Sequence, residues 1–263
     1  MRAVGFFAFL SFCLICLRAS AQTSKAIEAD LYKSFKKINY WNNRRSTDTT
    51  ANWVDSLEKA NDVFGKKLKH YTSAYPFTID QKFSGFSNTG LTINDSGDGH
   101  FRIYSWDTYM GGTMHDFANV IQYKTGQKTN SILDTTSGEG EQYVYCYSGL
   151  YTIKANNQSY YLALYYGVFS GKDRGEGIRI FSIEKGNPID AKLIKTQSGL
   201  RSKLYYDYDL FSIPKNVKDA DIHYDPGNKT ISLPVVVDPG KITGKRIVYK
   251  FTGKYFEKVI SKN

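Results

Sequence analysis

The segment from Asp95 to Tyr123 concentrates the side chains that could do chemistry in this sequence. It contains two of the four histidines and several carboxylates. Histidine next to a carboxylate is a common arrangement in general acid–base catalysis, and with further ligands it serves in transition-metal sites. The candidate catalytic set consists of His100, Asp107, His115 and Asp116.

The spacing of this set does not match a known metal-ligand motif. His100 and His115 are expected on different strands, and one sequence does not establish whether they meet. For each histidine in the chain we favour a hydrogen-bonded or solvent-exposed side chain over a metal ligand. We therefore expect neither a metal nor a cofactor.

Calcium binding is a separate interpretation of the same region. Asn94, Ser96 and Asp98 resemble the first ligands of an EF-hand loop. The twelfth position of such a loop requires a bidentate Glu, and Ser105 occupies it here. A hairpin turn at Asp98-Gly99 explains these residues without a metal, and we favour it.

A candidate ligand site stands at the end of a strand expected over residues 100–106. Trp106, Asp107 and Tyr109 occur there, just before a loop that contains the adjacent glycines Gly111 and Gly112. Binding residues often lie on loops that a rigid scaffold holds in place. We predict ligand binding by these three residues. The competing interpretation makes Trp106 part of the core and Asp107 the cap of a turn.

Aromatic residues are abundant, with 21 Tyr, 16 Phe and 3 Trp, and several tyrosines occur as consecutive pairs. Neighbouring residues of a strand point to opposite faces. Pairs such as Tyr165-Tyr166 and Tyr205-Tyr206 should therefore place one ring in the core and one on an outer face. Exposed rings beside polar groups suit a glycan or a peptide, although most of the tyrosines are explained by their preference for strands.

The motifs of several large enzyme classes are absent. The sequence has no G-x-S-x-G, H-E-x-x-H, Walker or C-x-x-C pattern. Cys146 lies in an alternating apolar run without a nearby base, which predicts a buried, unreactive thiol. We favour a non-enzymatic binding or structural domain of the cell envelope. The alternative is a secreted hydrolase that uses the His and Asp groups of residues 98–116.

The N-terminal residues predict export. Arg2 precedes an apolar run from Val4 to Leu17, and the small residues Ala19-Ser20-Ala21 follow. This is the layout of a cleavable signal peptide. The run is shorter than the roughly 20 apolar residues that span a bilayer. We expect cleavage before Gln22, a periplasmic or secreted protein, and no transmembrane anchor after cleavage.

The positive charge of the mature chain narrows the choice of partners. Two arginines leave with the signal peptide, so 33 basic and 25 acidic residues remain and the net charge is +8. A basic surface attracts polyanions, but the lysines are spread along the chain. Nucleic acid is not expected outside the cytoplasm. A glycan, a peptide or another envelope component is the expected partner.

The elements that position these residues divide into two regions after the signal peptide, which covers residues 1–21. Residues 22–76 carry two sets of apolar residues at helical spacing, one from Ile27 to Trp41 and one from Trp53 to Tyr71, with Asn52 available as an N-cap. They predict a helical hairpin packed on the rest. Residues 77–263 carry short aromatic and β-branched runs separated by turn residues, which predict antiparallel strands.

The β region contains an internal similarity. The six residues Arg102–Asp107 match Arg179–Glu184 in type at every position. The interval of 77 residues would fit two propeller blades of about 40 residues each. We expect a mainly β fold whose body is propeller-like or a sandwich or barrel. If the two segments are equivalent elements, Ile103 and Ile180 should both be buried and the two arginines should point the other way.

Two segments resemble a known group of proteins. Phe101–Thr108 with Gly111–Met114, and Val248–Glu257, are similar to uncharacterised secreted or periplasmic proteins of Bacteroidota-type bacteria. The junction Ala21-Gln22 is similar to signal cleavage sites in that group. The resemblance implies a secreted or envelope location, and the family has no established activity to carry over.

Overall fold

The computed structural model describes residues 3–45, 52–134, 145–217, 219–237 and 239–259. For residues 3–23 it describes only the backbone. The predicted signal peptide therefore lies outside the described side chains, and its cleavage stays a prediction. None of the helices in the described part of the chain is long and apolar enough to cross a membrane.

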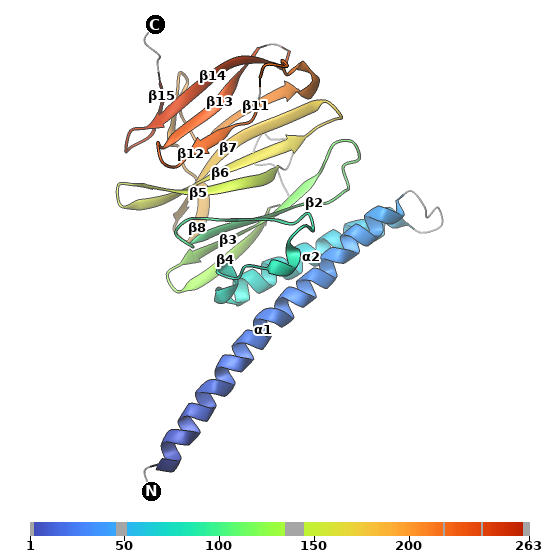
Figure 1. Cartoon of the computed structure of the whole chain (residues 1–263), viewed down its shortest axis with the longest axis vertical. Helices are drawn as coiled ribbons and strands as arrows, with labels where there is room; N and C mark the ends of the chain where they lie inside the picture. The colour runs from blue at the N-terminus through green and yellow to red at the C-terminus, as the bar shows by residue number, and fades with distance from the viewer. Residues whose placement is uncertain (1–2, 46–51, 135–144, 218, 238, 260–263) are drawn as a thin grey trace.

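The two predicted N-terminal helices are confirmed. Helix α1 covers Ala3–Arg44 and α2 covers Trp53–Ala74, and they form a long and a short arm of one hairpin (Figure 1). The Asn52 side chain accepts a hydrogen bond from the backbone N–H of Asp55, as expected of an N-cap. The apolar faces of both helices are buried over Ile27, Leu31, Phe35 and Ile38 and over Leu57, Ala60, Phe64 and Leu68.

Three sheets follow, and we call them A, B and C; their strand pairs are antiparallel except for one in sheet C. Two 3₁₀ turns, η1 (Pro76–Ile79) and η2 (Ser84–Phe86), lead into sheet A. Sheet A has the order β1-β2-β3-β4. Its strands are β1 (Thr92–Asp95), β2 (Phe101–Asp107), β3 (Phe117–Thr125) and β4 (Lys128–Asp134).

Sheet B has the order β11-β7-β6-β5, with β8 paired to β7. Its strands are β5 (Cys146–Ala155), β6 (Gln158–Val168), β7 (Asp173–Glu184), β8 (Asn187–Asp190) and β11 (Lys203–Asp209). The tyrosine alternation is confirmed for two pairs, because Tyr165 and Tyr206 are buried while Tyr166 and Tyr205 are exposed.

Sheet C has the order β10-β9-β15-β14-β13-β12, in which the β9–β15 pair is parallel. The 3₁₀ turn η3 (Leu210–Ser212) lies before β12 in the chain. The strands are β9 (Ile194–Thr196), β10 (Gly199–Arg201), β12 (His223–Asp225), β13 (Thr230–Val237), β14 (Lys241–Phe251) and β15 (Phe256–Lys258).

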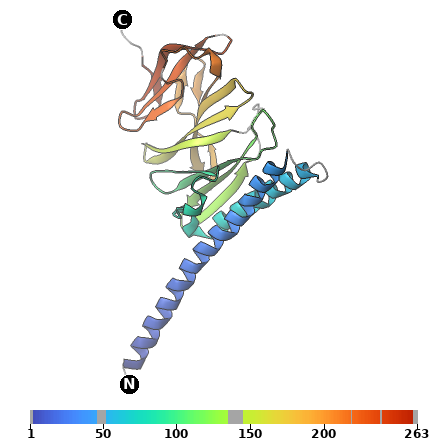
Figure 2. The ribbon, with the colours of Figure 1, turned by 45° about the vertical axis from the view of Figure 1, so that its right-hand side comes forward.

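The helices and sheets stack as layers in the order hairpin, sheet A, sheet B, sheet C (Figures 1 and 2). Three cores join them. One combines α1, α2 and the helix-facing side of sheet A, including Trp106. The second combines sheets A and B, and the third combines sheets B and C. Strand β2 is consequently buried on both faces, with Tyr104 toward the helices and Ile103 toward sheet B.

The mainly β, antiparallel fold is confirmed, but the described residues form no closed barrel or propeller. Ile103 and Ile180 are both fully buried, as predicted. Arg102 points to the other face and is nevertheless only 3% exposed. Its guanidinium donates to the backbone carbonyls of Thr78 and Gln81, because the segment after α2 closes this face of sheet A.

Candidate functional site

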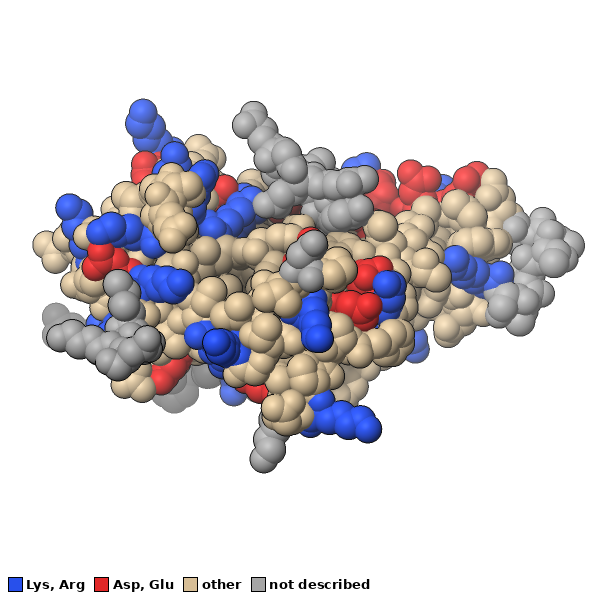
Figure 3. Space-filling view, turned by 90° about the horizontal axis from the view of Figure 1, so that it is seen from above, with Lys and Arg blue, Asp and Glu red and all other residues tan. Residues whose placement is uncertain are grey.

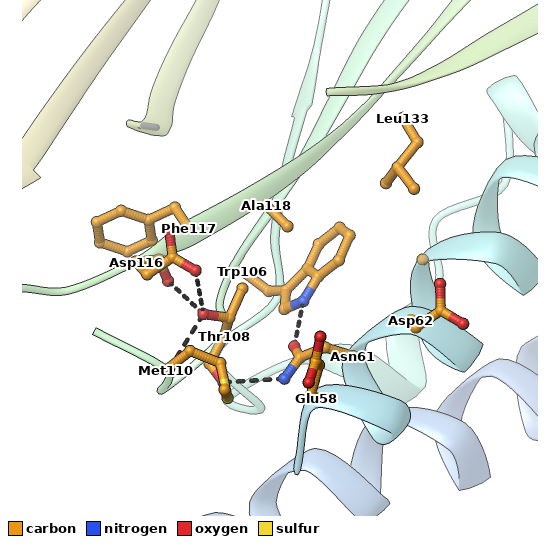
Figure 4. Close-up of a pocket in the computed structure, with 11 residues that line it drawn as sticks. Glu58, Asn61, Asp62, Trp106, Thr108, Met110, Asp116, Phe117, Ala118 and Leu133 are labelled. Atoms are coloured by element: carbon orange, nitrogen blue, oxygen red, sulfur yellow. Dashed lines mark hydrogen bonds between the residues drawn. The ribbon is translucent and has the colours of Figure 1, made fainter. Parts of the chain in front are cut away.

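The leading candidate site is a cavity of about 380 Å³ between α2 and sheet A (Figure 4). Pockets that bind small ligands typically enclose about 300–1,000 Å³. Its walls come from about two turns of α2, from the loop between β2 and β3, and from the ends of β2, β3 and β4. The lining residues are Glu58, Asn61, Asp62, Gly65, Trp106, Thr108, Met110, Asp116, Phe117, Ala118 and Leu133.

Trp106 forms part of the inner wall of the cavity. The alternation of β2 turns this side chain toward α2, where it meets the Phe64 ring edge to face at 5.0 Å between centroids. Its Nε1–H donates to Asn61 Oδ1 at 3.0 Å. The side chain is 1% exposed. Trp106 is therefore a core residue that borders the cavity, and it offers no open ring face for stacking.

Asn61 ties the helix to the loop. Its Nδ2 donates to the carbonyl oxygen of Thr108 at 2.9 Å and to that of Leu57 at 3.0 Å. Together with the bond from Trp106, three hydrogen bonds fix this one amide. The position of α2 relative to the β2–β3 loop is consequently set by polar contacts as well as by packing.

Gly65 permits the close approach of α2 to sheet A. A Cβ atom there would lie 3.2 Å from Leu133 Cδ1 and 3.5 Å from the Trp106 ring. Glycine inside a helix costs about 1 kcal/mol relative to alanine. That cost is offset by the contact between the helix backbone and the inner wall of the cavity.

Three carboxylates line the cavity, and none of its described lining residues is Lys or Arg. Glu58 and Asp62 come from α2, and Asp116 precedes β3. Asp116 Oδ2 accepts from the Thr108 hydroxyl at 2.7 Å, and Asp62 pairs with Lys66 at 2.8 Å. The chain as a whole has a formal net charge of +10, so this local group of carboxylates, which are also hydrogen-bond acceptors, is distinctive.

Two members of the predicted catalytic set meet beside the cavity. His115 Nδ1 lies 2.6 Å from Asp107 Oδ2. The Asp107 side chain is 16% exposed, and its Oδ1 accepts from the Tyr109 N–H at 2.7 Å. Burial raises the pKa of Asp107 even though this hydrogen bond and His115 act in the opposite direction. His115 is held by a buried carboxylate, while nearly half of its own side chain is exposed.

The other histidine of the set lies elsewhere. His100 belongs to the β1–β2 turn, at the opposite end of β2 from His115. Burial acts to raise the pKa of Asp98. Its carboxylate accepts hydrogen bonds from the Ser96 hydroxyl and the His100 N–H, and these outweigh burial, so the net pKa is lowered. These bonds make the hairpin turn that the sequence favoured over calcium. The described residues contain no group of three His, Cys, Asp or Glu side chains that could hold a metal.

The predicted ligand-binding residues separate in space. Trp106 borders the cavity, but Asp107 faces His115, and Tyr109 packs on the core around the helices. Tyr109 adopts a φ of +59°, which turns the chain away from the strand direction. The buried thiol of Cys146, whose pKa burial raises, agrees with an unreactive cysteine.

The sequence analysis missed the half of the cavity that comes from α2. Glu58, Asn61, Asp62 and Gly65 follow the spacing i, i+3, i+4 and i+7, so they occupy one face of the helix. That spacing was a usable signal. Two acidic residues, an amide and a glycine on one helix face are otherwise read as a solvated surface.

Comparison with known proteins adds no assignment: no family model, no curated protein and no solved structure matches the chain.

Proposed function

We propose that this protein is an exported binding domain of the cell envelope, and that the cavity between α2 and sheet A binds a neutral glycan. The observation that carries the proposal is the composition of the cavity. Its lining combines the carboxylates of Glu58, Asp62 and Asp116 with apolar groups such as those of Met110 and Leu133.

Sugars present both of the surfaces that such a cavity requires. Their hydroxyl groups donate hydrogen bonds that carboxylate oxygens accept, and their C–H faces pack on apolar side chains. An anionic ligand would be repelled by these carboxylates. A basic peptide side chain would also satisfy the carboxylates, but it would leave the apolar wall with little to contact.

The experiment is a binding screen of the purified protein against neutral oligosaccharides and against peptides rich in Lys and Arg. Binding of an oligosaccharide that Glu58→Gln weakens about tenfold supports the proposal, because a lost charge-assisted hydrogen bond is worth roughly 1.5–3 kcal/mol. The matched control is Glu184→Gln, an exposed carboxylate on the β7–β8 turn that is not part of the cavity. Binding of the peptides alone, or equal effects of both variants, would contradict it.

A second candidate function is hydrolysis, and the Asp107–His115 pair favours it. A carboxylate that orients an imidazole is the base-and-orienter part of many hydrolytic sites. In the described residues no Ser, Thr or Cys side chain is hydrogen-bonded to His115, so a water molecule would have to be the nucleophile. Hydrolysis of chromogenic esters or glycosides that His115→Gln abolishes, with unchanged thermal melting, would establish this candidate over the first.

A further inference from the structure

Sheet C exposes a basic surface at one end, far from the acidic cavity. Residues 192–203 and 250–259 contain seven Lys or Arg and one acidic residue, Glu257. Figure 3 looks down on sheet C and shows blue side chains gathered on the left, the side on which β15 lies in Figure 1. We call this surface the basic face and define it by Lys192, Lys195, Lys250, Lys254 and Lys258.

Strand register brings the central members of the basic face together. Glu257 of β15 pairs with Lys250 of β14 on one side and with Lys195 of β9 on the other. Directly paired residues point to the same face of a sheet, so Lys195, Lys250 and Glu257 share one face. Lys258 pairs with Tyr249, lies on the other face of β15 and lines the polar groove described below. Lys254 occupies the turn before β15. Lys192 lies close to the same strand, because the Phe256 N–H donates to the carbonyl oxygen of Leu193, the residue after Lys192. All five lysines are exposed.

Most of the charge on the basic face is uncompensated. Glu257 forms its ion pair with Lys195. Within the described part of the chain, no ion pair involves Lys192, Lys250, Lys254 or Lys258. A single carboxylate among five ammonium groups leaves a net attraction for polyanions, which salt weakens.

A polar groove runs along the edge of the basic face. It encloses about 670 Å³ and is lined by Lys195, Thr196, Gln197, Ser198, Tyr249, Glu257 and Lys258. Its hydroxyl and amide groups are hydrogen-bonding partners for an uncharged polar backbone, and its ammonium groups are partners for acidic substituents. This combination matches a chain that carries hydroxyls and carboxylates on every unit.

Two other polyanions fit the basic face less well. Proteins that bind single-stranded nucleic acids use exposed aromatic rings on which the bases stack. On the basic face, Tyr249 is buried and Lys195 lies over the Tyr255 ring. Membrane binding gains from aromatic side chains that insert into the interface. Among the described side chains the most exposed aromatic ring, Phe211 at 78%, belongs to η3, and Ser212 of η3 donates to the carbonyl oxygen of Gly240 at the opposite end of β14.

We propose that the basic face of sheet C binds an acidic polysaccharide, with carboxylate groups on the lysines and sugar hydroxyls in the groove beside them. This site is separate from the cavity between α2 and sheet A. It does not depend on the cavity's ligand, because the two surfaces belong to different layers and have opposite charge.

The test measures binding of the full chain to polygalacturonate at low and at physiological salt. Lys250→Glu/Lys258→Glu should weaken binding at least roughly tenfold, since two attractions are lost and each is replaced by repulsion. The matched control is Lys59→Glu/Lys69→Glu, which makes the same charge change on the exposed surface of α2. It should change the affinity less than about twofold.

A third variant guards against loss of fold. Glu257→Gln removes the one carboxylate that the described residues place on the basic face, so it should tighten polygalacturonate binding. A gain of binding cannot result from unfolding. Three results would overturn the proposal: no binding to polygalacturonate, equal weakening by the face and control variants, or stronger binding to vesicles of phosphatidylglycerol and phosphatidylcholine or to single-stranded DNA than to the polysaccharide.

Discussion

Glu176 of β7 is a carboxylate enclosed between sheets B and C, and it should make the stability of the protein depend on pH. Its Oε2 accepts from the Tyr206 hydroxyl at 2.9 Å and from the Ile222 N–H at 2.7 Å. Its Oε1 accepts from the Tyr208 hydroxyl at 3.2 Å. Burial raises the pKa of Glu176 to about 7, and Asp221 adds to the effect, although these hydrogen bonds oppose it.

The magnitude follows from the difference between the folded and unfolded pKa values of Glu176. The folded value of about 7 less the ordinary value of 4.5 is about 2.5. At about 1.4 kcal/mol for each pKa unit, this corresponds to at most about 3.5 kcal/mol, of which about 2.5–3 kcal/mol falls between pH 5 and pH 8. Between pH 4.5 and 7 the folded protein binds the proton that the unfolded chain has lost. Stability from this group is therefore present at low pH and is lost as pH rises toward 7.

The assay is urea unfolding of the wild type and of Glu176→Gln at pH 5 and pH 8. Glutamine keeps the shape and an acceptor oxygen but does not ionise. From pH 5 to pH 8, the wild type should lose up to about 3 kcal/mol more free energy of unfolding than the variant. Removing a donor to the charged form by Tyr206→Phe should raise the Glu176 midpoint seen by ¹³C NMR still further. Parallel pH profiles of wild type and Glu176→Gln, or an NMR midpoint near 4.5, would refute the reasoning.

Three further predictions concern the core, the helical hairpin and the N-terminus. Trp106→Ala should cost about 3–5 kcal/mol in urea unfolding, since it opens a void and leaves Asn61 Oδ1 without its donor; a loss below 1 kcal/mol would place Trp106 outside the core. Leu31→Asp should lower the melting temperature of the whole domain, because it buries an unpaired charge between α1 and α2, and an unchanged melting curve would mean that the hairpin is not integrated. Mass spectrometry of the native protein should find Gln22 at the N-terminus, and a chain that retains residues 1–21 would contradict the export prediction.

Periodicity was sufficient to predict the elements with strong apolar patterns. The second helix was expected to end at Tyr71 and ends at Ala74, and the strand expected over residues 100–106 is β2, which covers Phe101–Asp107. Strand β4 was missed because its buried residues include Thr129 and Ser131, which lack the apolar signature of a core strand. The stacking of three sheets was also hidden, because a strand buried on both faces has no alternation to read.

The candidate site was predictable only where its residues are neighbours in the chain. Asp107 and His115 were singled out together, and the β2–β3 loop brings them into contact. The bond between Trp106 and Asn61 joins residues 45 apart, and Glu176 meets Tyr206 across 30. Residues so far apart in the sequence are brought together by the packing of the layers. That packing depends on the whole fold and leaves no local pattern in the sequence.

The indole N–H signal of Trp106 tests the central claim, that the cavity between α2 and sheet A is a ligand site. The three tryptophans give three such NMR signals, and Trp41 and Trp53 serve as internal references because neither lines the cavity. Titration with the neutral oligosaccharide that binds best in the screen should shift the Trp106 signal in a saturable way and leave the other two in place. Saturable binding with an unchanged Trp106 signal, or with shifts confined to Trp41 and Trp53, would show that the ligand binds elsewhere.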